Sequence, residues 1–250
     1  MKKFNSYQIK LFMMFLMVVD HLSIIPNFLP FELIAIFHLI TRPVALWFTF
    51  TLVEGFIHTH NRYEYCRRLF TFAAIMMAGS SILLFGFGVP ILPIYPNIIF
   101  SLALTCAILI LIYHHDEKID KIPNIVRKIL AIFIFLVCFF FAEGMFIVPL
   151  FAIIFYKYRD NPKERNIWLI GMSLVMLALT LSYVTSMPNP NIYTIMYSEW
   201  FFASVIPFIY LYNGERGPNT KFSKYIFYIF YSVHIWILYI IATIIVTRSL

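Results

Sequence analysis

Long apolar stretches separated by short polar loops run through the sequence, and this pattern limits the possible folds more than any other feature. A helix needs about 20 apolar residues to cross the roughly 30 Å hydrocarbon core of a bilayer. The chain is 62% hydrophobic and 12% charged, whereas about a quarter of the residues in a soluble domain are charged. The sequence therefore predicts an all-α integral membrane protein, a polytopic bundle of transmembrane helices.

Nine apolar runs reach or approach the length of a membrane span, and we expect each to be helical. The runs are 7–28, 32–57, 69–88, 97–113, 126–142, 145–157, 166–184, 193–212 and 224–247. The run at 145–157 is too short to cross upright, so it forms either a tight hairpin or a re-entrant pair with the run before it. We find no internal repeat and expect a single domain over residues 1–250.

Basic residues gather in the loops on one side of the predicted bundle. Apart from Arg42 and Arg248, every Lys and Arg lies at the amino terminus or beside the loops HTHNRYEYCRR, HHDEKIDKIPN, KYRDNPKER and NGERGPNTK. The opposite side carries PNFLP, VPILPIYP, the AEG turn and SMPNPN. The positive-inside rule then predicts a cytoplasmic N-terminus and an external C-terminus. The net charge of +7 is interpreted as this topology signal and not as a nucleic-acid surface.

Ionisable residues interrupt three of these apolar runs at a similar depth. Asp20 and His21 lie about 20 Å from the cytoplasmic end of the first run, Arg42 roughly 16 Å from the outer end of the second, and His234 about 15 Å from the cytoplasmic end of the last. Intramembrane charges usually face a protein interior or a cavity and serve function. We interpret these residues as a functional site. The alternative is a structural Asp20–Arg42 pair with core histidines.

Three further residues of the predicted spans have a different interpretation. His38 lies near the outer interface and is more consistent with a structural role, whereas Glu199 is left open between structure and function. Pro43 disfavours the α conformation at the preceding residue, so we expect a local break at Arg42. Asp20 is expected to pair with Arg42 and not to orient its neighbour His21, because adjacent helical residues point about 100° apart.

A second group of polar residues lies at the predicted cytoplasmic side. Glu54 and His58 are four residues apart on one helical face, and Arg62 continues that face into the loop. An arginine such as Arg68 either anchors the helix at the interface or binds the phosphates of a cytosolic donor. Arg216, in PFIYLYNGERG, adds a further cation.

Several motifs, in order along the chain, resemble the TraX family. They are DH at Asp20, R-P at Arg42, V-E-G-F-I-H-T-x-N-R-x-x-Y-x-R-R-L ending at Leu69, Y-N-G-x-x-G, and K-Y-x-F-Y-x-x-Y-x-x-H ending at His234. The resemblance implies a membrane protein with the family's founding role, which is amino-terminal acetylation of conjugative pilin subunits. More distantly, the chain is similar to the acyltransferase-3 group, whose members move acyl groups from cytosolic acyl-CoA to extracytoplasmic acceptors.

The resemblance marks one set of residues for chemistry and another for the donor. The first is Asp20, His21, Arg42 and His234; the second is Glu54, His58, Asn61, Arg62, Arg68, Asn213 and Gly214 with Gly217, to which we add Arg216. In this hypothesis His21 deprotonates the acceptor, and Arg42 or His234 stabilises the oxyanion. Thr41 replaces the glycine usual in the family before the arginine, and Ser232 replaces a frequent proline.

We therefore expect a multi-pass protein of the bacterial plasma membrane that transfers acetyl from acetyl-CoA to an amine or hydroxyl. The acceptor is a pilin-like peptide N-terminus or a cell-surface glycan, and no metal or nucleic acid is expected. The oligomeric state is left open. Two other classes remain: a proton-coupled transporter, which uses the same midplane charges, and a non-catalytic factor for conjugation or surface assembly.

Overall fold

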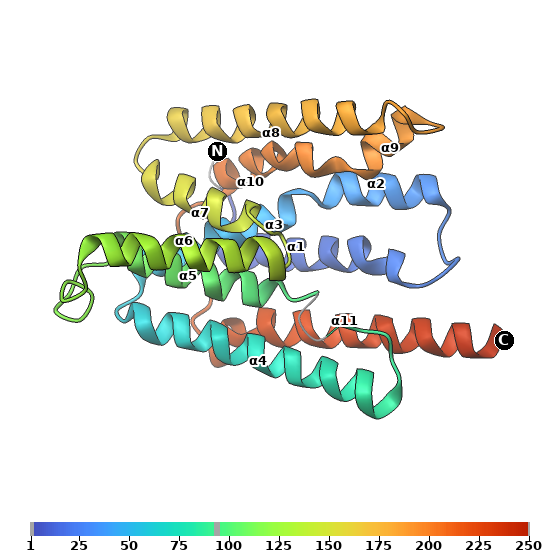
Figure 1. Ribbon diagram of the computed structural model, residues 1–250, viewed down its shortest axis with the longest axis horizontal. Helices are drawn as coiled ribbons and strands as arrows, with labels where there is room; N and C mark the ends of the chain where they lie inside the picture. The colour runs from blue at the N-terminus through green and yellow to red at the C-terminus, as the bar shows by residue number, and fades with distance from the viewer. Residues whose placement is uncertain (1–2, 93–95, 250) are drawn as a thin grey trace. The chain divides into compact units, whose positions relative to one another are not determined.

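A computed structural model describes residues 3–92 and 96–249, and these residues form helices and no strand (Figure 1). The predicted all-α class is confirmed. Lys2 and part of the VPILPIYP loop lie outside the described residues. The elements are α1 (Ser6–His21), η1 (Leu22–Ile24), α2 (Phe31–Thr41), α3 (Pro43–His58), α4 (Arg62–Phe87), α5 (Ile98–Tyr113), α6 (Asn124–Phe141), α7 (Ile147–Lys157), α8 (Pro162–Val184), α9 (Pro190–Met196), η2 (Ser198–Val205), α10 (Ile206–Leu211) and α11 (Lys221–Ser249).

Six helical segments of the described chain are long and apolar enough to cross a membrane. A seventh follows if Pro190–Met196 and Ser198–Leu211, which meet at a 46° bend, form one span. The other two apolar helices, α5 and α7, have only 16 and 11 residues. Every apolar run of the sequence is thus helical, but nine full-length spans are not confirmed. The orientation of the termini stays a prediction.

The chain divides into two compact units. One consists of Met1–Phe48 with Asn161–Leu250, and the other of Thr49–Asp160. The helix α3 begins in the first unit and ends in the second. The single domain expected from the sequence stays a prediction.

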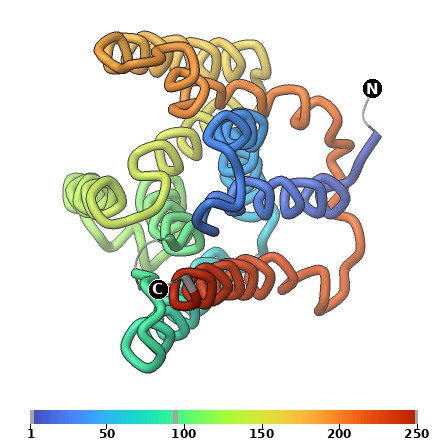
Figure 2. The backbone as a smooth tube through the Cα atoms, turned by 90° about the vertical axis from the view of Figure 1, so that its right-hand side faces the viewer, coloured from blue at the N-terminus to red at the C-terminus, as the bar shows by residue number. Residues whose placement is uncertain are grey.

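In the first unit, α1 packs against α2 and α11. Figure 1 shows α1 and α2 as neighbouring blue helices that are joined at one end by the turn at 25–30. The helix α8 packs along η2 and α9, and Figure 2 shows the chain folding back through α9 beside α8. Because α2 also contacts α9 and η2, polar residues from α1, α2, η2 and α11 meet in this unit.

In the second unit, α5 is the central helix and packs against α4, α6 and α7. Eleven of its 16 residues are buried. By contrast, only 22% of the residues in the most apolar stretch of α4, and 17% of those in α6, are buried. These two helices therefore present apolar side chains outward. Asn97 caps α5: its side chain accepts from the Phe100 amide at 3.0 Å and donates to the Ala73 carbonyl at 3.1 Å.

The backbone at Arg42 differs from the break that we expected. Arg42 keeps a right-handed helical conformation (φ −53°, ψ −33°), and Phe31–His58 qualifies as one 28-residue span. Pro43 has no N–H and so cannot donate to the Leu39 carbonyl four residues earlier. The Arg42 amide donates to that carbonyl instead, with an N–O distance of 3.4 Å. The carbonyl of His38 thereby loses its usual amide partner. The proline therefore shifts a hydrogen bond by one residue without breaking the helical path.

Candidate functional site

The carboxylate of Asp20, in the last turn of α1, is held by two side chains from the junction of α2 and α3. The Thr41 hydroxyl and Arg42 Nη2 both donate to Asp20 Oδ1, the second at 3.0 Å. Thr41 is buried, and the side chains of Arg42 and Asp20 are 16% and 25% exposed. The Asp20–Arg42 pairing expected from the sequence is thus present, and Thr41 joins it.

Two further acceptors fix the Arg42 guanidinium. Its Nε donates at 2.7 Å to the His38 carbonyl that the proline shift leaves open, and Nη1 lies 3.4 Å from Glu199 Oε1 on η2. Three of the five guanidinium N–H groups are used in this way, which leaves two for another acceptor. With two carboxylates around one guanidinium, the cluster carries a surplus negative charge when both carboxylates are ionised.

The two predicted catalytic histidines contact each other directly. His21 Nδ1 lies 3.0 Å from His234 Nε2, and His234 Nδ1 lies 2.8 Å from the Phe230 carbonyl one turn earlier in α11. A carbonyl only accepts, so neutral His234 carries its proton on Nδ1 and presents a lone pair at Nε2. His21 must then donate through Nδ1. This leaves His21 Nε2 as the unprotonated nitrogen of the neutral ring.

Aromatic packing holds both rings in place. Tyr231, which is 1% exposed, meets the rings of His21 and His234 edge to face, with centroid distances of 6.4 and 5.6 Å. The ring of Phe230 stacks on His234 at 4.9 Å. The contacts with Tyr231 and Phe230 restrict the rotation of the two histidine rings, which keeps His21 Nε2 in one orientation. At the other end of α1, Asn5 and Gln8 form a capping box that fixes where the helix begins.

A comparison with known protein families finds a match over most of the chain. The family model described as TraX protein matches residues 5–242 and includes every residue of the cluster. The chain belongs to the TraX family. No curated protein and no solved structure matches it. With its apolar helices, this TraX-family protein is a membrane protein.

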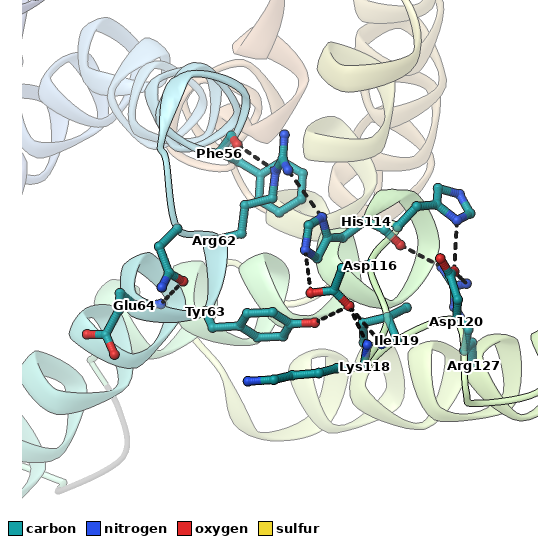
Figure 3. A network of polar contacts seen from close by, with 12 residues as sticks. Phe56, Arg62, Tyr63, Glu64, His114, Asp116, Lys118, Ile119, Asp120 and Arg127 are labelled. Atoms are coloured by element: carbon teal, nitrogen blue, oxygen red, sulfur yellow. Dashed lines mark hydrogen bonds and ion pairs between the residues drawn. The ribbon is translucent and has the colours of Figure 1, made fainter.

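The second unit of this TraX-family protein holds most of the predicted donor residues. His58 Nε2 lies 3.8 Å from Glu54 Oε2, and the His58 side chain is 75% exposed. Arg62 is held by groups outside that pair. Its Nε donates to the Phe56 carbonyl at 3.1 Å, and Nη1 lies 3.1 Å from His114 Nδ1 (Figure 3). The helical stripe expected from Glu54 to Arg62 therefore ends at His58.

Arg68 and Asn61 have different local roles in this unit. The Arg68 guanidinium lies 5.1 Å from the centre of the Tyr65 ring, and its Nε is buried without a hydrogen-bond partner among the described residues. Asn61 caps α4 by accepting from the Glu64 amide at 3.0 Å. Its donor role stays a prediction beside this structural one.

A close approach of α3 and α4 depends on Gly55. A Cβ at this position would lie 2.7 Å from the Tyr65 hydroxyl and 2.9 Å from its Cζ, so a side chain here would displace the ring under Arg68. Gly55, in the V-E-G-F-I-H part of the family motif, therefore has a packing role that its sequence context alone does not reveal.

The remaining predicted donor residues belong to the first unit, where the NGERG loop packs on the N-terminal segment. The Asn213 amide donates to the Phe4 carbonyl at 2.9 Å, and its side chain bonds Glu215 at 2.8 Å. Gly214 and Gly217 have φ of 89° and 86°, which disfavours any other residue. The exposed Arg216 lies on this loop.

Two residues outside the predicted catalytic set belong to the cluster. The sequence marks Thr41 only as a departure from the family pattern, and it leaves Glu199 open between structure and function. The depth of Glu199, about 12 Å from the outer end of its run against roughly 16 Å for Arg42, is the signal that could have paired them. Within residues 3–92 and 96–249, no three His, Cys, Asp or Glu side chains are grouped to hold a metal ion.

Proposed function

We propose that this protein is an acyltransferase of the bacterial plasma membrane that moves an acetyl group from cytosolic acetyl-CoA to an amine or hydroxyl. The acceptor in this proposal is a membrane-associated or exported molecule, either a pilin-like peptide N-terminus or a cell-surface glycan. The observation that carries the proposal is the hydrogen-bond chain from Phe230 through His234 to His21, which leaves a nitrogen lone pair on His21. A general base needs such a nitrogen within reach of the acceptor.

The proposed reaction begins with deprotonation of the acceptor. His21 Nε2 takes the proton as the acceptor nitrogen or oxygen bonds to the acetyl carbonyl carbon, and the carbonyl electron pair moves onto oxygen. Collapse of this tetrahedral intermediate breaks the C–S bond. The CoA thiolate leaves and takes the proton from His21 Nε2, which restores the neutral ring.

The residues around His21 fit the charges of this step. The negative charge of Asp20, the preceding residue, favours the imidazolium that forms on proton uptake. Arg42 has two N–H groups left for the developing oxyanion. His234 has both ring nitrogens engaged, so it fits the role of positioning residue and not that of oxyanion donor.

The donor end of the proposal rests on Arg62 and Arg68. Guanidinium groups suit phosphate geometry, and neither of these two forms a salt bridge with a carboxylate in the described chain. The Glu54–His58 pair, Asn61, Asn213, Gly214 and Arg216 stay predicted donor residues.

A proton-coupled transporter is the second candidate, and the bend of 46° between α9 and η2 favours it. Transporters commonly place a discontinuous helix at the substrate site, and Glu199 lies at the start of η2, beside the break. An absence of internal repeats in the sequence argues against this class.

Inverted membrane vesicles with and without the protein separate these candidates. The vesicles receive acetyl-CoA labelled in the acetyl group, and the label is followed in peptides, glycans and lipids by mass spectrometry. Protein-dependent label in one acceptor, with one CoA released per acetyl, is the result that we expect. Label that enters the vesicles without a covalent product supports transport and contradicts the acyltransferase. If protein that is shown to be folded gives neither a labelled acceptor nor label inside the vesicles, the result supports an assembly factor.

A further inference from the structure

The loop between α5 and α6 forms a polar network with the start of α4 (Figure 3). The residues that the loop contributes to this network have no part in the proposed chemistry. His114 lies at its centre. It contacts Arg62 through Nδ1 at 3.1 Å and Asp116 through Nε2 at 3.2 Å, and its side chain is 12% exposed. The network belongs entirely to the second unit.

Arg62 differs from other arginines of this unit in the acceptors that hold it. Arg67 is paired with Glu64 at 2.6 Å and Arg127 with Asp120 at 3.2 Å. Arg62 instead donates to a backbone carbonyl and to an imidazole, and it lies 5.1 Å from the centre of the Phe56 ring. Both acceptors are neutral. Its positive charge is therefore fixed in position without being neutralised by a contacting carboxylate.

The contact with Arg62 sets the protonation of His114. An arginine only donates, so His114 Nδ1 must be the acceptor and the ring proton must be on Nε2, from which it bonds Asp116. Asp116 is held in turn by the amides of Lys118 and Ile119 at 3.0 and 2.8 Å and by the Tyr63 hydroxyl at 3.0 Å. These donors keep Asp116 a carboxylate, which fixes the ring of His114.

We propose that His114 is a positioning residue that aims Arg62 at a phosphate group of the donor, and that proton uptake by His114 releases Arg62. This inference rests on the proposed function. A protonated His114 carries N–H groups on both nitrogens and can no longer accept from Arg62. Two cations then face each other at 3.1 Å, and donor affinity falls as the solution becomes acidic.

Asp116 accepts from the His114 ring, and cations and further titratable groups lie around this pair. Arg62, Tyr63 and Asp116 contact the His114 ring, and Arg127 Nη2 bonds the His114 carbonyl. One contact further out, Lys118 lies over Tyr63, His115 and Arg127 pair with Asp120, and Tyr156 stacks on Tyr113.

Two variants separate the contacts of His114. In His114→Asn, the amide oxygen takes the approximate place of Nδ1 and accepts from Arg62 without titrating. In His114→Gln, the amide nitrogen takes the approximate place of Nε2 and keeps only Asp116. His115→Asn is the matched control, because His115 is 71% exposed and pairs with Asp120.

The experiment measures binding of coenzyme A to the full-length protein in nanodiscs at pH 7.5 and pH 5.5. We expect His114→Gln to lose about 10-fold in affinity at pH 7.5, the value of one hydrogen bond to a charged group, with His114→Asn and His115→Asn near wild type. Acidification weakens binding more in wild type than in His114→Asn. Protonation of the ligand's own phosphate, with a second pKa of about 6, affects both proteins equally.

The outcomes distinguish the two proposals. Wild-type binding that is matched by His114→Gln at both pH values overturns the role of His114 and leaves the proposed donor in place. An equal pH response in wild type and His114→Asn overturns the proton-linked release. A folded wild-type protein that binds no coenzyme A overturns the proposed donor, and with it this inference.

Discussion

At the scale of single residues, one oxygen of Asp20 accepts from both Thr41 and Arg42, which allows the two contacts to be separated. Thr41→Val removes the hydroxyl and keeps the shape of the side chain. We expect a loss of about 1.5–3 kcal/mol in the free energy of unfolding, because a hydrogen bond to a carboxylate is lost while the ion pair remains. Thermal unfolding in detergent measures this. Thr41→Ser retains the hydroxyl and serves as the control, and equal stability of all three proteins would contradict the assignment.

Asp116 makes the stability of its loop depend on pH. Its pKa is lowered from 3.8 to about 2, first by the Ile119 amide and then by the Tyr63 hydroxyl and the Lys118 amide. A lowered pKa in the folded state means that this stabilisation is complete above pH 4 and is lost as the pH falls toward 2. The difference in thermal midpoint between wild type and Asp116→Asn should therefore shrink between pH 4 and pH 2. A difference that is constant over this range would contradict the prediction.

At the scale of helices, the contact between α3 and α4 depends on one glycine. Gly55→Ala places a Cβ within 2.7 Å of the Tyr65 hydroxyl, and the ring beneath Arg68 must move. We expect a weaker affinity for the donor and a lower thermal midpoint. The control is Gly171→Ala in α8, where a Cβ meets nothing within 4 Å and removal of a helical glycine should stabilise by roughly 0.5–1 kcal/mol. Equal effects of the two substitutions would refute the close approach.

The sequence predicts the existence of the helices well, because apolar runs of this length have few alternatives. It also predicts the Asp20–Arg42 pair, since two opposite charges at similar depth in neighbouring helices seldom remain apart. The lengths of α5 and α7 were less accessible, because hydropathy does not distinguish a short buried helix from a full span. Burial of 11 residues of α5 is the result of packing by three neighbouring helices, which no local pattern encodes.

Contacts of neutral polar groups were the other part that the sequence could not supply. Thr41 was invisible as a site residue because a threonine in a helix usually bonds its own backbone, and here it also bonds His38 O at 3.1 Å. The tautomer of His21 depends, through His234, on the carbonyl of Phe230 in α11, which is 209 residues away in sequence. Such geometry follows only from the packing of α1 against α11.

At the scale of the whole molecule, the distribution of Lys and Arg predicts which loops face the cytoplasm. Single cysteines introduced at Lys118, Asp160 and Glu215, in a background with the native cysteines replaced, should react with a membrane-impermeant maleimide only in inverted vesicles. A cysteine at Asn189 should react only in intact cells stripped of their outer layers. Labelling of Asn189 and Lys118 from the same side would contradict the predicted orientation.

The central claim is that His21 takes the acceptor proton, and the rate of acetyl transfer by His21→Ala tests it most directly. The rate is measured with labelled acetyl-CoA in vesicles that contain equal amounts of folded protein. His60→Ala is the control, because His60 is exposed and has no part in the proposed site. We expect His21→Ala to lose on the order of 10²–10⁴-fold in rate with little change in coenzyme A affinity. A His21→Ala protein that transfers acetyl as fast as His60→Ala would contradict the account.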